Sequence, residues 1–177
     1  NQRMKIMNNI VLIGFMGVGK GAVARELSKL SGRFAIDGDD MIESLFNKKI
    51  SKIFEDEGEE AFRDAEKNLA KFLEHNVKGA IISTGGGFYR QRNLKKIGTI
   101  IYLKSSFAKI MERLQSAPNS AKKLAKRPLL KDLEKAKKLH KERNSAYARK
   151  ADIIIIAEDK SPKKIAKEIL KALKGQK

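Results

Sequence analysis

The sequence contains no cysteine and no tryptophan, and it has only two histidines and three prolines among its 177 residues. Without cysteine the chain forms neither a disulfide nor a thiolate metal site. The two histidines, His75 and His140, lie far apart and show no zinc-binding spacing, which argues against a histidine metal site. We expect both to be surface residues.

Long hydrophobic runs are also absent. No apolar run approaches the roughly 20 residues that a membrane-spanning helix needs. The first residues, NQRMKIMNN, are not followed by the apolar stretch of a secretory signal. We therefore expect a cytoplasmic protein that makes no membrane contact. The length is that of one domain, and it is sufficient to bury a core without disulfides or structural metals.

The net charge of +18 is unevenly distributed. Residues 1–90 hold 14 Lys and Arg against 13 Asp and Glu, whereas residues 91–177 hold 25 against 8. Such a basic surface attracts nucleic acids and also small polyanions such as nucleoside triphosphates, although lysine-rich helix faces also serve solubility alone. Aromatic residues make up only 6% of the chain and lie mostly at apolar-face positions, so we expect no nucleic-acid partner.

Five short apolar runs alternate with longer helical patterns. They are rich in Ile and Val and lack polar alternation, which is typical of strands buried on both faces. The runs cover residues 9–15, 34–37, 80–85, 99–104 and 151–157. The sequence therefore predicts a single α/β domain over residues 1–177, with a five-stranded parallel sheet flanked by helices.

Helices are predicted over residues 19–30, 39–46, 59–75, 133–150 and 162–173. Asp39 or Asp40 is expected to cap the second helix, with Glu43 as a capping-box partner, and Ser161 precedes Pro162 as a helix cap. The apolar faces are expected at Val23, Leu27 and Leu30 in the first helix and at Phe62, Leu69, Phe72 and Leu73 in the third.

Residues 116–132, SAPNSAKKLAKRPLLKD, interrupt this alternation. The segment is basic and holds two of the three prolines. A loop of this length inside a compact domain is usually functional and is often a lid, although a plain surface excursion is the alternative.

The stretch GFMGVGKG, Gly14 to Gly21, matches the phosphate-binding pattern G-x-x-x-x-G-K-[ST] in all but its last residue. The glycines allow a turn whose backbone N–H groups face a phosphate, and Lys20 is expected to reach the terminal phosphates. The expected nucleotide-binding residues are Gly17, Val18, Gly19, Lys20, Gly21 and Ala22. Gly21 stands where a hydroxyl normally joins the magnesium shell, so we expect weakened metal binding or slow turnover.

Asp37 and Asp39 follow the second predicted strand, at the sheet edge where open α/β folds bind ligands. Two carboxylates at this edge suit a metal and a substrate separately. Helix capping is the structural alternative for Asp39.

Together with this loop, several stretches resemble shikimate kinases, small enzymes of the nucleoside-monophosphate-kinase-like P-loop group, over almost the whole chain. The matching stretches are GFMGVGK, FAIDGDDMIE, ISKIFEDEGEEAFRDAE, AIISTGGGF, KRPLL, ERNSAYARKAD and DKSP. The resemblance implies an enzyme of aromatic amino acid (chorismate) biosynthesis. It would phosphorylate the 3-hydroxyl of shikimate with ATP and Mg²⁺, and we expect a monomer.

The resemblance also assigns roles to individual residues. Lys20, Asp39 and Arg127 would be catalytic, with Asp39 orienting the attacking hydroxyl and Arg127 closing onto the phosphates. Asp37 would hold magnesium through water, and Lys160 would pack near adenine. The shikimate would be bound by Asp39, Arg63, Gly85, Gly86, Gly87 and Arg143, of which the two arginines grip its carboxylate.

Two departures from the family pattern leave alternatives open. The hydroxyl is missing at Gly21, and the lid contains no arginine before Arg127, where an adenine contact is often found; Lys122, Lys123 or Lys126 are the candidate replacements. The alternatives are another small-molecule kinase, such as a gluconate or nucleotide kinase, and a P-loop protein that binds nucleotide with weak catalysis. A GTPase is disfavoured because no N-K-x-D signature is present.

Overall fold

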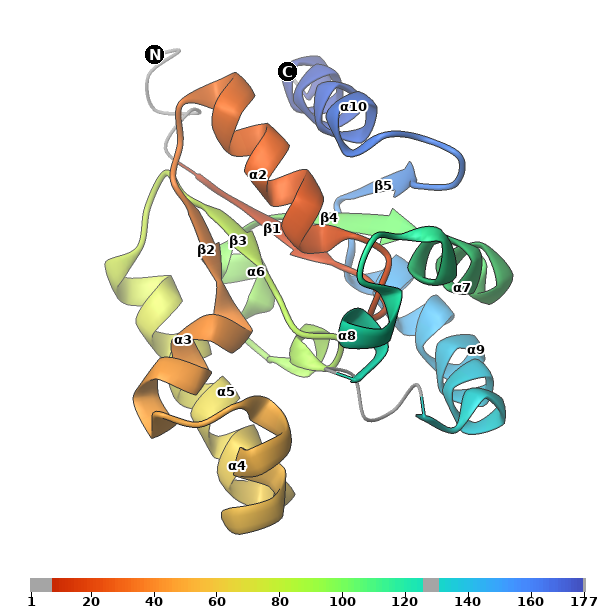
Figure 1. Ribbon diagram of the computed structural model, residues 1–177. Helices are drawn as coiled ribbons and strands as arrows, with labels where there is room; N and C mark the ends of the chain where they lie inside the picture. Colours follow the sequence, from red (N-terminus) through yellow and green to blue (C-terminus); the bar gives the residue numbers. More distant parts are fainter. Residues whose placement is uncertain (1–7, 126–130, 177) are drawn as a thin grey trace.

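Five parallel strands form the centre of the computed structural model, which describes residues 8–125 and 131–176 (Figure 1). The sheet has the order β2-β3-β1-β4-β5. The strands are β1 (Asn9–Ile13), β2 (Ala35–Asp37), β3 (Ile81–Ser83), β4 (Gly98–Lys104) and β5 (Ile153–Ile156). Each predicted apolar run contains one of these strands or nearly all of it, which confirms the predicted α/β fold.

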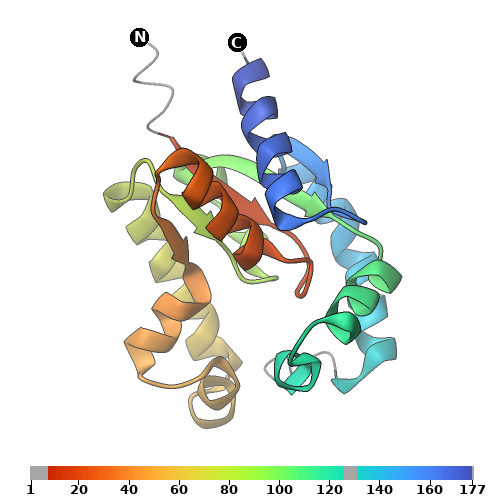
Figure 2. The ribbon, with the colours of Figure 1, turned by 45° about the horizontal axis from the view of Figure 1, so that its top comes forward.

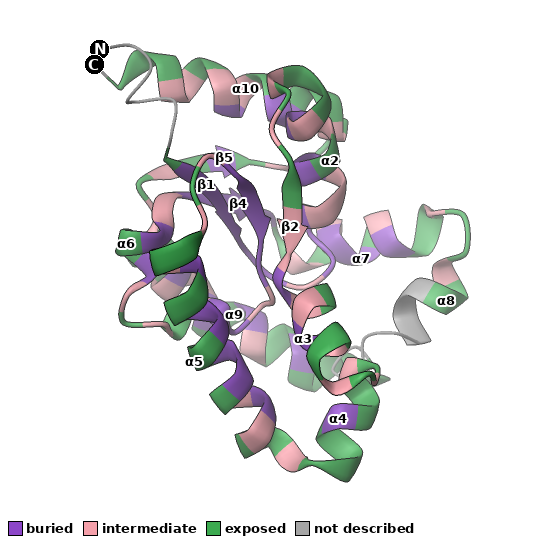
Figure 3. Ribbon diagram, turned by 90° about the vertical axis from the view of Figure 1, so that its left-hand side faces the viewer, coloured by how far each residue is buried: buried purple, intermediate pink, exposed green. Residues whose placement is uncertain are grey.

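Helices cover both faces of the sheet (Figure 3). The helices are α2 (Lys20–Ser31), α3 (Gly38–Phe46), α4 (Ile50–Asp56), α5 (Gly58–Asn76), α6 (Leu94–Ile97), α7 (Phe107–Ser116), α8 (Ser120–Ala125), α9 (Leu133–Lys150) and α10 (Pro162–Gly175), with a 3-10 turn η1 (Phe88–Arg90). Helices α2 and α10 pack together on one face, and α5, α6 and α9 lie on the other. All five residues of β1 are buried, as expected for a central strand covered on both sides.

The side chain of Asn9 fixes the start of three neighbouring segments. Its Nδ2 donates to the carbonyl oxygens of Val77 (2.7 Å) and Ile97 (2.8 Å), and its Oδ1 accepts from the amide of Ala80 at 2.9 Å. A buried amide with its partners supplied is stable, whereas an unpaired one is costly. The amino ends of β1, β3 and β4 are thereby held in register.

Two helical arms extend past the carboxyl ends of the strands (Figure 2). One arm consists of α3, α4 and the start of α5, and the other contains α7 and α8. The predicted lid, residues 116–132, begins where α7 ends and includes α8. Residues 126–130 of the lid, including Lys126 and Arg127, lie outside the described residues.

Some local predictions were wrong. Helix α3 begins at Gly38 and its cap is Asp37, whose Oδ1 accepts from the amide of Asp40 at 3.1 Å; neither Asp39 nor Asp40 caps it. Glu43 is not a capping-box partner, because its carboxylate accepts from the amide of Ile50 at the start of α4. The cap at Ser161 is confirmed, since its Oγ accepts from the amide of Lys164.

Side-chain burial also corrects the sequence analysis. Leu30 and Phe72 are exposed, so the buried faces of α2 and α5 are narrower than predicted. His75 is exposed as predicted, but His140 is buried. No helix in residues 8–125 and 131–176 has both the length and the hydropathy to cross a membrane.

Candidate active site

The loop between β1 and α2 has a conformation that requires glycine. Gly17 and Gly19 have φ angles of 85° and 106°, which side chains other than glycine rarely adopt. A Cβ added to Gly17 would also lie 2.7 Å from the side chain of Leu114, so that α7 closes on the loop. The turn ends at the first residues of α2, where free backbone N–H groups favour a phosphate.

Lys20 lies across this loop with its side chain buried. Its Nζ donates to the carbonyl oxygens of Gly14 at 2.5 Å and Phe15 at 3.1 Å. The ammonium is therefore held inside the turn, where a phosphate oxygen would compete with the two carbonyl groups for its protons. This position agrees with the role that the motif predicts for Lys20.

Two carboxylates stand at the end of β2, as predicted. Burial raises the pKa of Asp39 to about 6, and the nearby charges of Asp37 and Glu66 add to this rise, while Lys20 opposes it. Burial also raises the pKa of Asp37, whose side chain caps α3. Asp39 is thus an acid whose proton exchanges near neutral pH, a property that suits proton transfer.

Three consecutive glycines bring the predicted substrate residues together. A Cβ added to Gly85 would lie 2.7 Å from Oδ1 of Asp39, and one added to Gly87 would lie 2.7 Å from Nη1 of Arg63. One added to Gly86 would lie 3.1 Å from Nη1 of Arg143 and 3.7 Å from the amide nitrogen of Met16 in the phosphate loop.

The glycine segment, residues 85–87, therefore lies against all three predicted side chains, which come from three different elements: α3, α5 and α9. The absence of side chains at this segment allows all three groups to approach the main chain closely beside the phosphate loop. The structure brings the predicted substrate residues into one place.

The guanidinium of Arg143 is buried without a matching negative charge. The side chain is 5% exposed, and its Nε is buried with no hydrogen-bond partner. In the described part of the chain no carboxylate pairs with it, and its Cζ lies 6.0 Å from the centre of the Tyr89 ring. A buried cation with no counter-charge and an unsatisfied N–H is costly, so the site fits an anionic ligand.

Arg63 differs from Arg143 because it already has acidic partners. Its Nη1 lies 2.5 Å from Oε1 of the buried Glu66, and its Nη2 lies 3.4 Å from the exposed Glu59. Glu66 fixes the direction of the guanidinium, which is one-third exposed. Tyr147 holds the neighbouring main chain, because its hydroxyl donates to the carbonyl oxygen of Gly86 at 2.7 Å.

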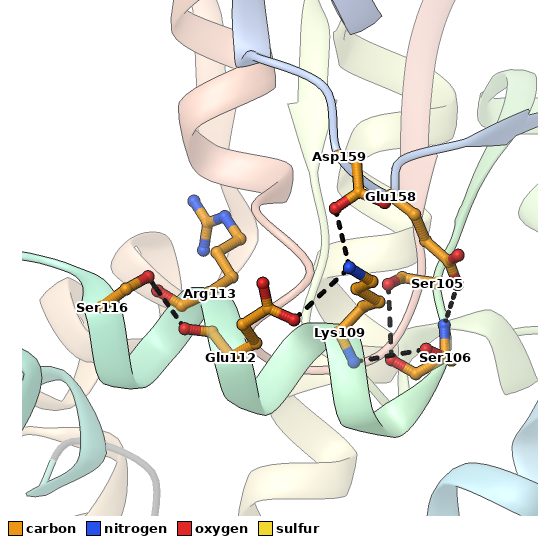
Figure 4. A network of polar contacts seen from close by, with 8 residues as sticks. All are labelled: Ser105, Ser106, Lys109, Glu112, Arg113, Ser116, Glu158 and Asp159. Carbon is orange, nitrogen blue, oxygen red and sulfur yellow. Dashed lines mark hydrogen bonds and ion pairs between the residues drawn. The ribbon is translucent and has the colours of Figure 1, made fainter.

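On the other side of the phosphate loop lies a cavity of about 280 Å³. It is bounded by Val18 of the loop, by α7 and by the segment after β5 that ends at Lys160. Figure 4 shows Lys109 reaching from α7 to Glu112 (3.4 Å) and Asp159 (2.9 Å). The contact with Asp159 joins the two walls, whereas Glu112 lies on the same helix as Lys109.

Lys160, predicted to pack near adenine, lines this cavity, and its Nζ is paired with Glu168 at 2.9 Å. Its ammonium is therefore turned toward α10, and its alkyl chain is the part left to pack against a base. Lys122 is exposed, and the side chain of Lys123 lies outside the described residues. No lid lysine is placed at the cavity by the described contacts.

Arg113, which lies just before the lid on α7, was not predicted as a site residue. Its Nη1 donates to the carbonyl oxygen of Gly17 at 3.0 Å, and a Cβ added to Gly19 would lie 3.0 Å from its Nη2. Figure 4 shows its side chain pointing from α7 toward the phosphate loop. The signal was an arginine in the helix preceding the lid, three residues before the segment in which an arginine was sought.

A metal ion would find few protein ligands here. Among residues 8–125 and 131–176, no three His, Asp or Glu side chains are grouped so that they could hold one. Asp37 remains the single carboxylate predicted for this role, and Gly21 contributes no oxygen from its side chain.

Comparison with known proteins agrees with this geometry. A family model described as shikimate kinase matches residues 16–174. The chain is 41% identical to a shikimate kinase of Helicobacter hepaticus, over 94% of this chain and 96% of that protein. It is 39% identical to one of Sulfurihydrogenibium sp., over 95% and 99% respectively.

Solved structures are similar as well. A shikimate kinase from Acinetobacter baumannii in complex with shikimate has a TM-score of 0.87 and 30% identity, covering 99% of this chain and 98% of that one. The shikimate kinase from Aquifex aeolicus has a TM-score of 0.75 and 32% identity, covering 94% and 96%.

Proposed function

This chain belongs to the shikimate kinase family, and from that membership we propose that it transfers the γ-phosphoryl group of ATP to the 3-hydroxyl of shikimate. The bond from the γ-phosphorus to the β,γ-bridging oxygen breaks, and a bond to the 3-oxygen forms. The hydroxyl proton leaves to a base, and the products are ADP and shikimate 3-phosphate. The observation that carries the proposal is the convergence of Asp39, Arg63 and Arg143 on the glycine segment.

Arg143 is the proposed anchor of the substrate carboxylate. A guanidinium offers two parallel N–H donors to a carboxylate, and this one is buried, uncompensated and has an unsatisfied Nε. Arg63 provides the second cation, oriented by Glu66. A small anionic ring held between them lies beside the glycine segment with its hydroxyls toward Asp39.

Asp39 is the proposed partner of the reacting hydroxyl. With a pKa of about 6 it is mostly ionised at neutral pH, and it accepts a proton more readily than an ordinary carboxylate does. Its position on α3, next to Gly85 and close to the phosphate loop, supports this role.

The phosphates are proposed to bind the backbone amides of the loop, from Gly17 to Ala22, with Lys20 exchanging its two carbonyl partners for phosphate oxygens. The predicted lid arginine, Arg127, is kept as a proposed contact to the transferring group. The adenine base of ATP is assigned to the cavity between α7 and the segment ending at Lys160, where Arg113 offers a planar cation for stacking.

Magnesium is the expected companion of the nucleotide. One half-buried carboxylate, Asp37, interacts electrostatically with Lys20 of the loop and also caps α3. A carboxylate at this place fits a hydrated ion held through water. When bound, the ion neutralises part of the triphosphate charge. We further propose that the chain acts as a monomer in the cytoplasm.

A coupled assay of ADP release tests the proposed reaction. We expect turnover that depends on shikimate, and none with gluconate or without a second substrate. Arg143→Lys should raise the KM for shikimate about tenfold or more, because it loses the two-pronged contact, while the KM for ATP changes little. The matched control is Arg149→Lys, an exposed arginine of the same helix. ATP binding without shikimate-dependent turnover would contradict the proposal in favour of a weakly catalytic nucleotide-binding protein.

A further inference from the structure

A charged side chain lies beside residue 21, where the usual hydroxyl is missing. A Cβ added to Gly21 would meet only one neighbour within 4 Å, Nη1 of Arg25, at 3.6 Å. Residue 21 belongs to the first turn of α2, immediately after Lys20. A guanidinium nitrogen therefore lies next to the position from which a Ser or Thr would extend its oxygen.

Helix geometry explains this placement. Arg25 follows Gly21 by four residues, so the two share one face of α2, and helical side chains lean toward the amino end of the helix. With no side chain on residue 21, the long side chain of Arg25 extends over the first turn. Its guanidinium thus points toward the end of α2 at which the phosphates are expected.

The charge of Arg25 adds to that of Lys29 in lowering the pKa of Glu26, but no direct contact in the described part of the chain holds its guanidinium. Within residues 8–125 and 131–176 it forms no hydrogen bond and no ion pair, and its side chain is exposed. The adjacent acid, Glu26, is paired with Lys29 at 2.8 Å. Arg113, by comparison, is bonded to the carbonyl oxygen of Gly17. Arg25 is therefore available to an anion that approaches the first turn of α2.

We propose that Arg25 contacts the phosphates in the nucleotide site. Its charge partly replaces that of a metal ion which a hydroxyl at residue 21 would help to bind. The proposal rests on nucleotide binding at the loop between β1 and α2. A guanidinium stays charged at all working pH values and donates two parallel N–H groups to phosphate oxygens. Nucleotide binding by this chain should then depend only weakly on a divalent cation.

Calorimetric titration with ADP, in EDTA and in Mg²⁺, tests this inference without relying on turnover. For the unaltered chain we expect the Kd for ADP to rise only a few-fold when EDTA replaces Mg²⁺. Arg25→Gln should raise the Kd in EDTA about tenfold or more, the effect of losing a charge-assisted hydrogen bond. The Kd of Arg25→Lys in EDTA should lie between those of the unaltered chain and Arg25→Gln, because lysine keeps the charge but lacks the two parallel N–H donors. Lys67→Gln, which removes an exposed cation of α5, is the matched control and should leave both Kd values nearly unchanged.

A double-mutant cycle with Gly21→Ser sharpens the test. If the Arg25 guanidinium and a serine-bound metal serve the same side of the phosphates, their effects on the Kd for ADP are not additive. In Mg²⁺, Arg25→Gln should then raise the Kd less in a chain that carries Gly21→Ser than in the unaltered chain. Tight ADP binding in EDTA by Arg25→Gln would overturn the inference while leaving the proposed function intact. Failure of the unaltered chain to bind ADP under either condition would instead overturn the proposed function.

Discussion

At the scale of single residues, Asp39 links burial to catalysis. In the free enzyme its pKa of about 6 means that the carboxylate form is lost as the pH falls through this value. We therefore expect kcat/KM for shikimate to be flat above about pH 7 and to fall roughly tenfold per pH unit well below 6, since this ratio reports the free enzyme. Initial rates measured from pH 5 to 8.5 check this. A profile that stays flat down to pH 5 would contradict the assignment.

The same raised pKa of Asp39 lowers the stability of the folded protein at neutral pH. The native state binds the Asp39 proton more tightly than the unfolded chain does, so this group destabilises the protein above pH 6, and the effect disappears below pH 4. Asp39→Asn should therefore abolish most activity yet raise the free energy of unfolding at pH 7.5 by about 1–3 kcal/mol. Urea unfolding at pH 7.5 and pH 5 measures this gain, which should shrink at the lower pH. Asp64→Asn, an exposed neighbour on α5, should show no such gain.

Gly21 makes a second residue-scale prediction. The Cβ position has ordinary space around it, so Gly21→Ser fits and restores a hydroxyl beside the phosphates. We expect higher kcat and a lower Mg²⁺ concentration for half-maximal rate. Gly21→Ala is the control, because both substitutions remove a helical glycine, which stabilises by on the order of 1 kcal/mol or less, but only the serine adds a hydroxyl. Equal rates and equal Mg²⁺ dependence for the two variants would show that the missing ligand does not matter.

At the scale of secondary-structure elements, α9 connects several parts of the site. Arg143 faces the glycine segment, and Tyr147 donates to Gly86 from one turn further along. In the other direction, Nε2 of His140 lies 2.8 Å from the carbonyl oxygen of Ser105 at the cavity, and its ring packs edge-on against Phe15 of the phosphate loop. One helix thus positions the substrate side and the nucleotide side together.

Removing one hydroxyl from α9 tests this connection. Tyr147→Phe keeps the rings of Tyr89 and Tyr102 packed but leaves the carbonyl of Gly86 without its donor. We expect the KM for shikimate to rise several-fold and stability to fall by about 1–2 kcal/mol. The hydroxyl of Tyr102, which donates to Asn144, provides the control in Tyr102→Phe, which should lower stability without a comparable change in KM. Equal effects of the two variants on KM would contradict a specific role for Tyr147.

Elements differ in how well the sequence predicted them, and the reason is physical. All five strands were recognised because each lies within a short apolar run, and the bounds of α9 were also correct. Burial on both faces holds for β1, β3 and most of β4, whereas the edge strands β2 and β5 are partly exposed, contrary to the prediction. The burial of His140 was missed because the buried face of α9 consists of Ala136, His140, Arg143 and Tyr147, which carries almost no hydrophobic signal. Helix α8 was missed because its six residues contain a single leucine and show no apolar period, whereas α4 was missed although Ile50, Ile53 and Phe54 have helical spacing.

The site itself was predicted from motifs, and the convergence of Asp39, Arg63 and Arg143 agrees with that prediction. Motif spacing does not reveal which groups share a contact across the fold. Arg113 reaches Gly17 over 96 residues of sequence, and the cap of α3 fell to Asp37 because the helix starts earlier than its polar pattern indicated.

At the scale of the whole molecule, the charge asymmetry has a spatial meaning. The basic half, residues 91–177, contributes α6, β4, β5 and the helices from α7 onward (Figure 1), and all residues that line the cavity assigned to the adenine base except Val18 belong to it. The more neutral half carries the acid Asp39. A nucleotide with several negative charges therefore approaches a positive surface, whereas the singly charged shikimate gains less from it.

Salt should affect the KM values for ATP and shikimate to different extents. Because ions screen long-range attraction, we expect the KM for ATP to rise about threefold or more between roughly 50 and 300 mM KCl, and the KM for shikimate to rise less. Initial-rate measurements at fixed pH and free Mg²⁺ check this. Potassium acetate in place of chloride controls for specific anion binding. Parallel changes in both KM values would contradict an electrostatic role for the basic half.

The glycine segment also bears on how such a protein can diversify. Its floor is main chain, and a methyl group at any of the three positions would approach Asp39, Arg143 or Arg63 to within about 3 Å. Random mutation at the floor is therefore expected to block the pocket instead of reshaping it. A change of phosphoryl acceptor would therefore require substitutions of the side chains around the glycine segment. Directed evolution toward other hydroxy acids should begin with α5 and α9.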